Sequence, residues 1–177
     1  MRAFVAVFPP PEARRALIEA AKAHPDFRLT DPRRVHLTLT FLGDVSPGAL
    51  PRIIAALEPV RDKHEPFDTV TSNFGAFPSP HRARILWAGL GEGAEQIRAL
   101  AETVEACLEP EGFAREDRPF VSHITLGRAR RPASFDAAGA DLPELRFTVS
   151  GVDLVQSKHE ATGVAYSTLA RYEFQGF

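Results

Sequence analysis

Two short segments of the sequence repeat the pattern His-x-Thr inside a run of β-forming residues. The first is VHLTLTFLG, which contains His36 and Thr38, and the second is SHITLGRA, which contains His123 and Thr125. Successive side chains of a β-strand point to opposite faces, so the histidine and threonine of each copy share one face. The apolar residues between and after them share the other face. The sequence therefore predicts two strands, each with a buried apolar face and a face that carries an imidazole and a hydroxyl.

The rest of the chain alternates between strand-forming segments and helical segments with one apolar face. Helices are expected over 11–24, 50–57 and 93–109, the last two because large apolar residues recur every three or four positions. Residues 130–144 are expected to form a loop, and 158–162 a hairpin connection. The expected strands cover residues 2–8, 35–43, 67–77, 84–90, 123–129, 145–157 and 163–174.

These elements predict an α+β fold with antiparallel pairing. Short connections favour antiparallel strands over a doubly wound parallel sheet, and no glycine-rich turn follows the first strand. A chain of 177 residues that is 44% apolar has enough material for one sizeable core. We expect one domain over residues 1–177, with two similar lobes and one His-x-Thr motif in each of the halves 1–90 and 91–177.

Charge and cysteine content exclude several classes of protein. The net charge is −2, so the chain has no global positive field and any anion site must be local. Cys107 is the only cysteine, which excludes an intrachain disulfide and zinc sites built on paired cysteines. The apolar run at the N-terminus stops at three prolines after six residues, too soon for a membrane span. A cytoplasmic protein without a membrane partner is expected.

Two histidines that share a cleft have an evident chemical use. The pKa of an unperturbed histidine is about 6.5, so near neutral pH one ring can accept a proton while the other donates one. Hydrolysis of a cyclic phosphodiester needs such a base to activate water and such an acid to protonate the leaving oxygen. The two threonine hydroxyls can hold the non-bridging phosphate oxygens. This scheme needs neither a metal ion nor a cofactor.

The paired segments VHLTLTFLGDV and RPFVSHITLGRA resemble the signature of the 2H phosphoesterase superfamily, in particular the RNA 2′,3′-cyclic phosphodiesterases, historically called 2′-5′ RNA ligases. The resemblance implies that His36 and His123 are catalytic and that Thr38, Thr125 and Arg128 bind the phosphate. It also implies two pseudo-symmetric lobes, each an antiparallel sheet with outer helices, around a central active-site groove. The implied reaction converts an RNA 2′,3′-cyclic phosphate to a 2′-phosphomonoester. As a working hypothesis, His36 protonates the departing O3′ and His123 activates water.

Two positions need comment when the resemblance is transferred. Ser122 stands where many relatives have proline before the second histidine, and it removes no catalytic group. Strict strand alternation places Arg128 on the face opposite His123 and Thr125. A phosphate-binding role for Arg128 therefore requires a bulge or the end of a strand near Gly127.

Other residues around the motifs are candidates for contacts with RNA. Phe77 is a candidate for stacking on the terminal base, because aromatic side chains commonly hold single-stranded RNA in this way. Arginines near the motifs that can make the groove positive are Arg33, Arg34, Arg82, Arg84, Arg118, Arg130 and Arg131. The remaining histidines, expected to be solvated, are His24, His64, His81 and His159.

Several functions remain open at this stage. The expected partner is RNA with a 2′,3′-cyclic phosphate end or a nucleoside 2′,3′-cyclic phosphate, bound by a monomer. The same two histidines could join RNA ends through a 2′-5′ linkage, which is the reverse reaction with a 5′-hydroxyl in place of water. The chain could also be a phosphodiesterase for small cyclic phosphates or a non-catalytic module that binds RNA ends.

Overall fold

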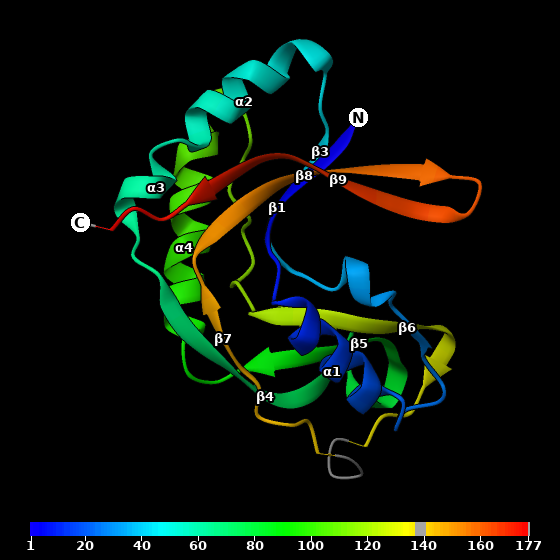
Figure 1. Ribbon diagram of the computed structural model, residues 1–177. Helices are drawn as coiled ribbons and strands as arrows, with labels where there is room; N and C mark the ends of the chain where they lie inside the picture. Colours follow the sequence, from blue (N-terminus) through cyan, green and yellow to red (C-terminus); the bar gives the residue numbers. More distant parts are fainter. Residues whose placement is uncertain (137–140, 177) are drawn as a thin grey trace.

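The computed structural model describes residues 1–136 and 141–176, which form two antiparallel sheets and their flanking helices (Figure 1). The four-stranded sheet has the order β3(Leu37–Asp44), β1(Arg2–Val7), β8(Gly151–Glu160), β9(Gly163–Glu173). The five-stranded sheet has the order β2(Arg28–Leu29), β6(His123–Ala133), β5(Ala83–Leu90), β4(Phe67–Phe77), β7(Arg146–Val149). The predicted α+β class with two sheets is confirmed.

The helices are exchanged between the two sheets. Helix α1(Pro11–Ala21) follows β1 of the four-stranded sheet but contacts β6 of the five-stranded sheet. Helix α4(Ala94–Leu108) follows β5 of the five-stranded sheet but contacts β3 of the other. The shorter helices α2(Leu50–Leu57) and α3(Val60–Lys63) both contact α4. Each lobe is thus covered by a helix that the sequence attaches to the other lobe.

The sheets do not follow the two halves of the sequence. Strands β1 and β3 precede residue 90, and their sheet is completed by β8 and β9 from the C-terminal part of the chain. The sequence halves 1–90 and 91–177 therefore carry one motif each, but the boundary between them does not coincide with the boundary between the lobes. Pairing between strands far apart in sequence decides the sheets, and local patterns do not encode that pairing.

The segment 145–157, expected to be one strand, forms two strands in different sheets. β7 belongs to the five-stranded sheet, β8 belongs to the four-stranded sheet, and only Ser150 lies between them. A β-carbon at Gly151 would lie 2.5 Å from the carbonyl oxygen of Tyr172, so only glycine fits where the chain enters the second sheet. The chain crosses between the lobes at this point without a loop.

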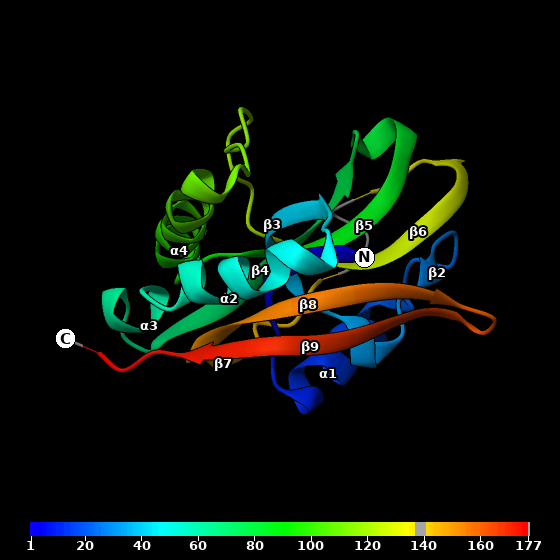
Figure 2. The ribbon, with the colours of Figure 1, turned by 90° about the horizontal axis from the view of Figure 1, so that it is seen from above.

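Two connections are shorter than expected. Residues 130–133, assigned to a loop, continue β6, whereas residues 137–140 of that loop lie outside the described residues. Residues 158–160, assigned to a hairpin connection, continue β8, so that β8 and β9 form a long hairpin. In both ribbon views this hairpin and β6 extend to the same side of the molecule (Figure 1, Figure 2).

One hydrophobic core joins the elements of both sheets. The apolar face predicted for α4 is buried, and it packs with β-strand residues from both lobes. A smaller cluster of Phe4, Ala6 and Val155 lies apart from this core and includes the partly buried Phe8 and Tyr166 at its edge. The smaller cluster supports one of the two motif histidines. None of the described helices is both long and apolar enough to cross a membrane.

Candidate active site

The two motif histidines lie at equivalent places, at the start of a strand in each sheet. His36 comes directly before β3, and His123 is the first residue of β6. These two strands belong to different sheets but contact each other. The fold therefore brings together two segments that are far apart in the sequence.

Each imidazole is held by the same backbone hydrogen bond. Nδ1 of His36 lies 2.6 Å from the carbonyl oxygen of Arg34, and Nδ1 of His123 lies 2.8 Å from that of Val121. A carbonyl oxygen only accepts hydrogen bonds, so Nδ1 of each ring carries the proton and donates it. This fixes the tautomer and leaves Nε2 of each neutral ring free to accept a proton. Both histidines are therefore oriented for proton transfer through Nε2.

His36 also contacts its own motif threonine. Its Nε2 lies 3.0 Å from Oγ1 of Thr38, as expected from their position on one strand face. The neutral ring accepts a hydrogen bond from the Thr38 hydroxyl, and the protonated ring donates to the same oxygen. Thr125 lies two residues after His123 and is likewise half-buried.

The surroundings of His36 disfavour its charged form. Burial lowers the pKa of His36, its hydrogen bond to the Arg34 carbonyl opposes this shift, and the charge of His123 lowers the pKa further. The last effect requires the two rings to be close enough to interact electrostatically. The contact between β3 and β6 and this electrostatic effect together indicate that His36 and His123 lie near each other across the two lobes.

A β-bulge follows the threonine in both motif strands. Thr38 and Thr40 pair with the adjacent residues Ala6 and Val5, so Leu39 is the extra residue in β3. Thr125 and Gly127 pair with the adjacent residues Trp87 and Leu86, so Leu126 is the extra residue in β6. Such a bulge shifts the side-chain alternation by one position. The two strands therefore share a backbone irregularity as well as a sequence motif.

The bulge in β6 places Arg128 on the strand face that carries His123 and Thr125. Leu126 and Gly127 are both buried, and Arg128 is exposed on the face of His123 and Thr125. Burial raises the pKa of Tyr166 in β9, and the charges of Arg34 and Arg128 oppose that rise. Arg128 of one sheet therefore acts on a residue of the other sheet. A phosphate-binding role for Arg128 requires a bulge or a strand end near Gly127, and β6 has a bulge there.

Aromatic rings surround both histidines. The ring centroids of Phe4, Phe8 and Tyr166 lie 4.9, 5.5 and 5.4 Å from that of His36. On the other lobe, Phe77 and Trp87 lie 5.1 and 6.2 Å from His123. The indole of Trp87 covers Gly75, where a β-carbon would lie 2.1 Å from the ring. These rings pack against the imidazoles and help to fix their orientation.

Phe77, the residue expected to stack on a base, is less exposed than Phe41, another aromatic residue near the motif histidines. Phe77 is half-buried and its ring is nearly perpendicular to that of His123, so part of its surface is already covered. Phe41 is 75% exposed and lies 6.3 Å from Phe4, which stacks on His36. Phe41 follows His36 by five residues, as Arg128 follows His123. Alignment of the two motifs alone could have singled it out.

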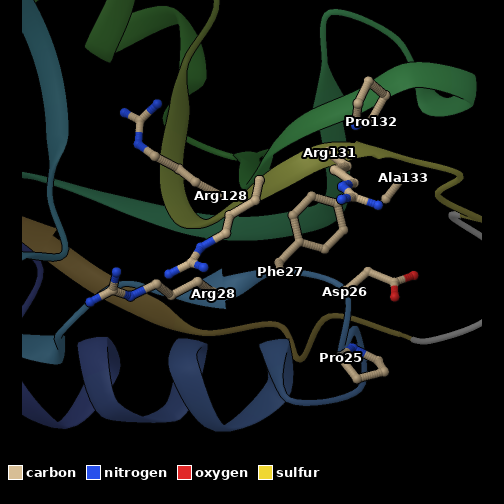
Figure 3. Close-up of a pocket in the computed structure, with 9 residues that line it drawn as sticks. Pro25, Asp26, Phe27, Arg28, Arg128, Arg131, Pro132 and Ala133 are labelled. Carbon is tan, nitrogen blue, oxygen red and sulfur yellow. The ribbon is translucent and has the colours of Figure 1, made fainter.

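The arginines near the motifs have different surroundings. Arg130 and Arg131 line one pocket together with Arg128 and with Arg28, which sequence reasoning missed (Figure 3). Arg33 is bound to Asp31, whereas Arg82, Arg84 and Arg118 are exposed. Arg34 acts through its backbone carbonyl on His36 and through its charge on Tyr166.

Two of the other histidines were expected to be solvated but pack against neighbouring side chains. His24 packs against Phe74 and Phe135, and burial lowers its pKa. His64 shares a hydrogen bond of 2.9 Å with Thr103. His81 and His159 are exposed. Within the described residues, no group of three or more His, Cys, Asp or Glu side chains is arranged to hold a metal ion.

Comparison with known proteins identifies the family. The profile of the 2′-5′ RNA ligase superfamily matches residues 9–161. The chain belongs to this superfamily. The RNA 2′,3′-cyclic phosphodiesterase of Thermus thermophilus is 34% identical over 186 residues, covering 99% of this chain and 91% of that protein. The protein of the same name from Aeropyrum pernix is 32% identical over 148 residues, covering 80% of this chain and 83% of that protein.

Solved structures of superfamily proteins have the same fold. The crystal structure of TT0787 of Thermus thermophilus aligns with a TM-score of 0.88 at 32% identity, covering 99% of both chains. The crystal structure of Escherichia coli LigT complexed with 3′-AMP aligns with a TM-score of 0.81 at 25% identity, covering 98% of both chains. The expected resemblance to 2H phosphoesterases and the two-lobed fold are thus confirmed.

Proposed function

We propose that this protein hydrolyses the 2′,3′-cyclic phosphate at the end of an RNA strand to a 2′-phosphomonoester. The observation that carries the proposal is the matched pair of imidazoles, each held through Nδ1 by a backbone carbonyl and each starting a motif strand of a different sheet. The names of the superfamily relatives support the same substrate class.

In the proposed reaction His123 and His36 move one proton each. Nε2 of His123 accepts a proton from water while the water oxygen attacks phosphorus and the bond from phosphorus to O3′ breaks. Protonated His36 donates its Nε2 proton to the departing O3′. After the reaction His36 has lost one proton and His123 has gained one. Proton exchange with solvent restores the starting state. Each such proton transfer is typically worth about 10² to 10⁴ in rate.

The polar groups on the same strand faces hold the phosphate. Thr38 and Thr125 donate hydrogen bonds to its non-bridging oxygens, and the guanidinium of Arg128 pairs with its charge. The phosphate in turn favours the charged form of His36, which burial disfavours in the free site. Substrate binding thus prepares His36 to act as the acid.

The proposed mechanism uses side chains alone, without metal ions or cofactors. Activity is therefore expected to survive prolonged treatment with excess chelator. A strict requirement for an added divalent ion would instead indicate metal-assisted hydrolysis.

The deciding experiment uses an oligoribonucleotide that ends in a 2′,3′-cyclic phosphate. Incubation with the enzyme should give a 2′-phosphate end, identified by its resistance to an enzyme specific for 3′-phosphates and by chromatography against both standards. A 3′-phosphate product would overturn the assignment of O3′ as the leaving group. A joined RNA product would indicate 2′-5′ ligation, and binding without turnover would indicate a module that only recognises RNA ends.

The cellular setting follows from the proposed substrate. RNA ends and nucleoside 2′,3′-cyclic phosphates both occur where RNA is processed, and the single cysteine, Cys107, suits a reducing cytoplasm. Both motif strands come from one chain, so a monomer contains the whole proposed site. Sedimentation or light scattering of the purified protein tests this expectation.

A further inference from the structure

A pocket of about 570 Å³ lies beside the proposed catalytic pair and is lined by four arginines (Figure 3). Arg28 belongs to the short strand β2, and Arg128, Arg130 and Arg131 belong to β6. Asp26 is the one acidic residue among the lining residues. Figure 3 shows Arg28 and Arg128 reaching out on one side of the pocket, with Arg131 on the other. The pocket therefore concentrates positive charge in a chain whose net charge is negative.

The arrangement of these arginines is unfavourable in the free protein. Arg28 lies directly opposite Arg128 in the pairing of β2 with β6. Like charges at directly opposed positions of neighbouring strands destabilise a sheet. A bound anion would offset that repulsion. A purely structural role of the two arginines would not explain why they are placed opposite each other.

The pocket arginines differ from those arginines of the chain that are neutralised by a neighbouring carboxylate. Arg52, Arg98, Arg146 and Arg171, among others, each form an ion pair with a carboxylate. Within residues 1–136 and 141–176, none of the four pocket arginines has a carboxylate at ion-pair distance. Their guanidinium groups are thus available to an external anion.

Arg128 connects the pocket to the catalytic pair. It lines the pocket, and its charge also acts on Tyr166, whose ring contacts His36. Because Arg128 belongs to both places, a phosphate adjacent to the one at His36 and His123 would lie on the side of this pocket. Guanidinium groups bind phosphate oxygens in pairs of parallel hydrogen bonds, which makes arginine the side chain suited to such a site.

We propose that Arg28, Arg130 and Arg131 of this pocket bind the phosphate attached to the 5′-oxygen of the terminal nucleotide, while Arg128 holds the reacting phosphate. In RNA, the phosphate on the 5′-oxygen is the first internucleotide phosphodiester. This inference rests on the proposed function and adds a preference for RNA ends over free nucleoside cyclic phosphates. Contacts of this kind fix the position of a strand without reading its sequence. The pocket thereby distinguishes chain ends from nucleosides whatever the base.

The test compares three cyclic-phosphate substrates with the same terminal nucleotide. The first is the nucleoside 2′,3′-cyclic phosphate, the second carries an added 5′-phosphate, and the third is a dinucleotide with a normal phosphodiester. A dinucleotide with a neutral methylphosphonate linkage is the control of equal size. For the wild-type enzyme, kcat/KM is expected to be at least about tenfold higher for the phosphodiester than for the methylphosphonate. The neutral linkage loses one charge-assisted hydrogen bond, and this loss sets the size of the effect.

Variants then locate this preference in the protein. Arg28→Ala, Arg130→Ala and the double variant Arg130→Ala/Arg131→Ala should reduce the ratio toward one while leaving kcat/KM for the nucleoside cyclic phosphate within about twofold of wild type. Arg52→Ala on α2 removes the same charge outside the pocket and should leave the ratio unchanged. Equal hydrolysis of the phosphodiester and the methylphosphonate by wild type would overturn the proposal, as would an unchanged ratio in the double variant. A preference for the 5′-phosphorylated nucleotide over the dinucleotide would assign the pocket to free nucleotides instead.

The same ligands separate this proposal from the proposed function. Hydrolysis of the nucleoside cyclic phosphate by wild type tests the catalytic assignment alone. Titration of the two dinucleotides into the His123→Ala variant measures their binding without turnover, so the pocket is tested even if no substrate is hydrolysed. Equal affinity for the charged and neutral linkages would reject the pocket, and tighter binding of the charged linkage that Arg130→Ala abolishes would support it.

Discussion

The two motif strands share a backbone and differ in their surroundings. Each starts with a histidine whose Nδ1 bonds to the carbonyl two residues earlier, and each has a bulge after its threonine. Five residues after the histidine, however, β3 carries an exposed Phe41 and β6 carries an exposed Arg128. The repeated backbone orients the two imidazoles alike, and the unequal side chains give one side of the site an apolar surface and the other a positive charge.

The largest expected effect comes from removing either imidazole. His36→Ala and His123→Ala should each lower kcat on a cyclic-phosphate substrate by about 10² to 10⁴, because each removes one proton transfer. Both variants should unfold cooperatively near the wild-type melting temperature. The readout is single-turnover hydrolysis together with thermal unfolding. A folded variant with near wild-type turnover would show that its histidine is not part of the mechanism.

The division of labour between the two histidines can be tested with a better leaving group. In a substrate with sulfur in place of O3′, the departing thiolate needs no proton, so the acid becomes dispensable. The activity lost in His36→Ala should return with this substrate, and the activity lost in His123→Ala should not. Rescue of His123→Ala alone would assign the acid to β6 and the base to β3.

The unequal positions Phe41 and Arg128 can be compared directly. Arg128→Ala should lower kcat/KM by about 10 to 100-fold, because a charge-assisted hydrogen bond to the phosphate is lost. Phe41→Ala should leave kcat on a nucleoside cyclic phosphate unchanged, since the ring contributes no charge to the phosphate. Its effect on stability should be small because the ring is 75% exposed. An equal loss of kcat in both variants would remove the functional distinction between these positions.

The smallest expected effect is on the pH dependence of stability. Burial lowers the pKa of His36 in the folded state, so the unfolded chain binds a proton more readily. The free energy of unfolding should therefore fall as the pH decreases below about 6.5, the ordinary histidine value. Between pH 7.5 and 5.5, the free energy of unfolding measured in urea should fall less for His36→Asn than for wild type. An identical fall in both proteins would mean that the buried ring does not contribute.

Local patterns in the sequence predicted the elements and much of the site. The alternation around His36 and His123 placed both strands. The condition for a phosphate-binding Arg128, a bulge or a strand end near Gly127, is met by the bulge in β6. The apolar stripe of α4 likewise matched a buried face. These features depend on neighbours within a few residues, which is the range that periodicity reports.

The remainder depended on contacts between distant segments. Arg28 was missed because β2 has only two residues and shows no period. His24 was taken as solvated because the two phenylalanines that cover it, Phe74 and Phe135, are far away in the sequence. The segment around Ser150 read as one strand because nothing local marks a change of sheet. Composition indicates which side chains are apolar, but it does not indicate which partners cover them.

The way the chain passes from β7 into β8 also affects how activity is acquired during synthesis. β1 pairs with β8, and Tyr166 of β9 contacts His36, so the surroundings of the first histidine are completed only by strands that are synthesised after both motifs. A nascent chain that already contains both motifs would still have an unfinished four-stranded sheet. Pairing over such a separation makes folding slow compared with a helical protein of this size. Neither half is expected to act as an enzyme by itself, and an incomplete chain should not cleave RNA ends before it is released.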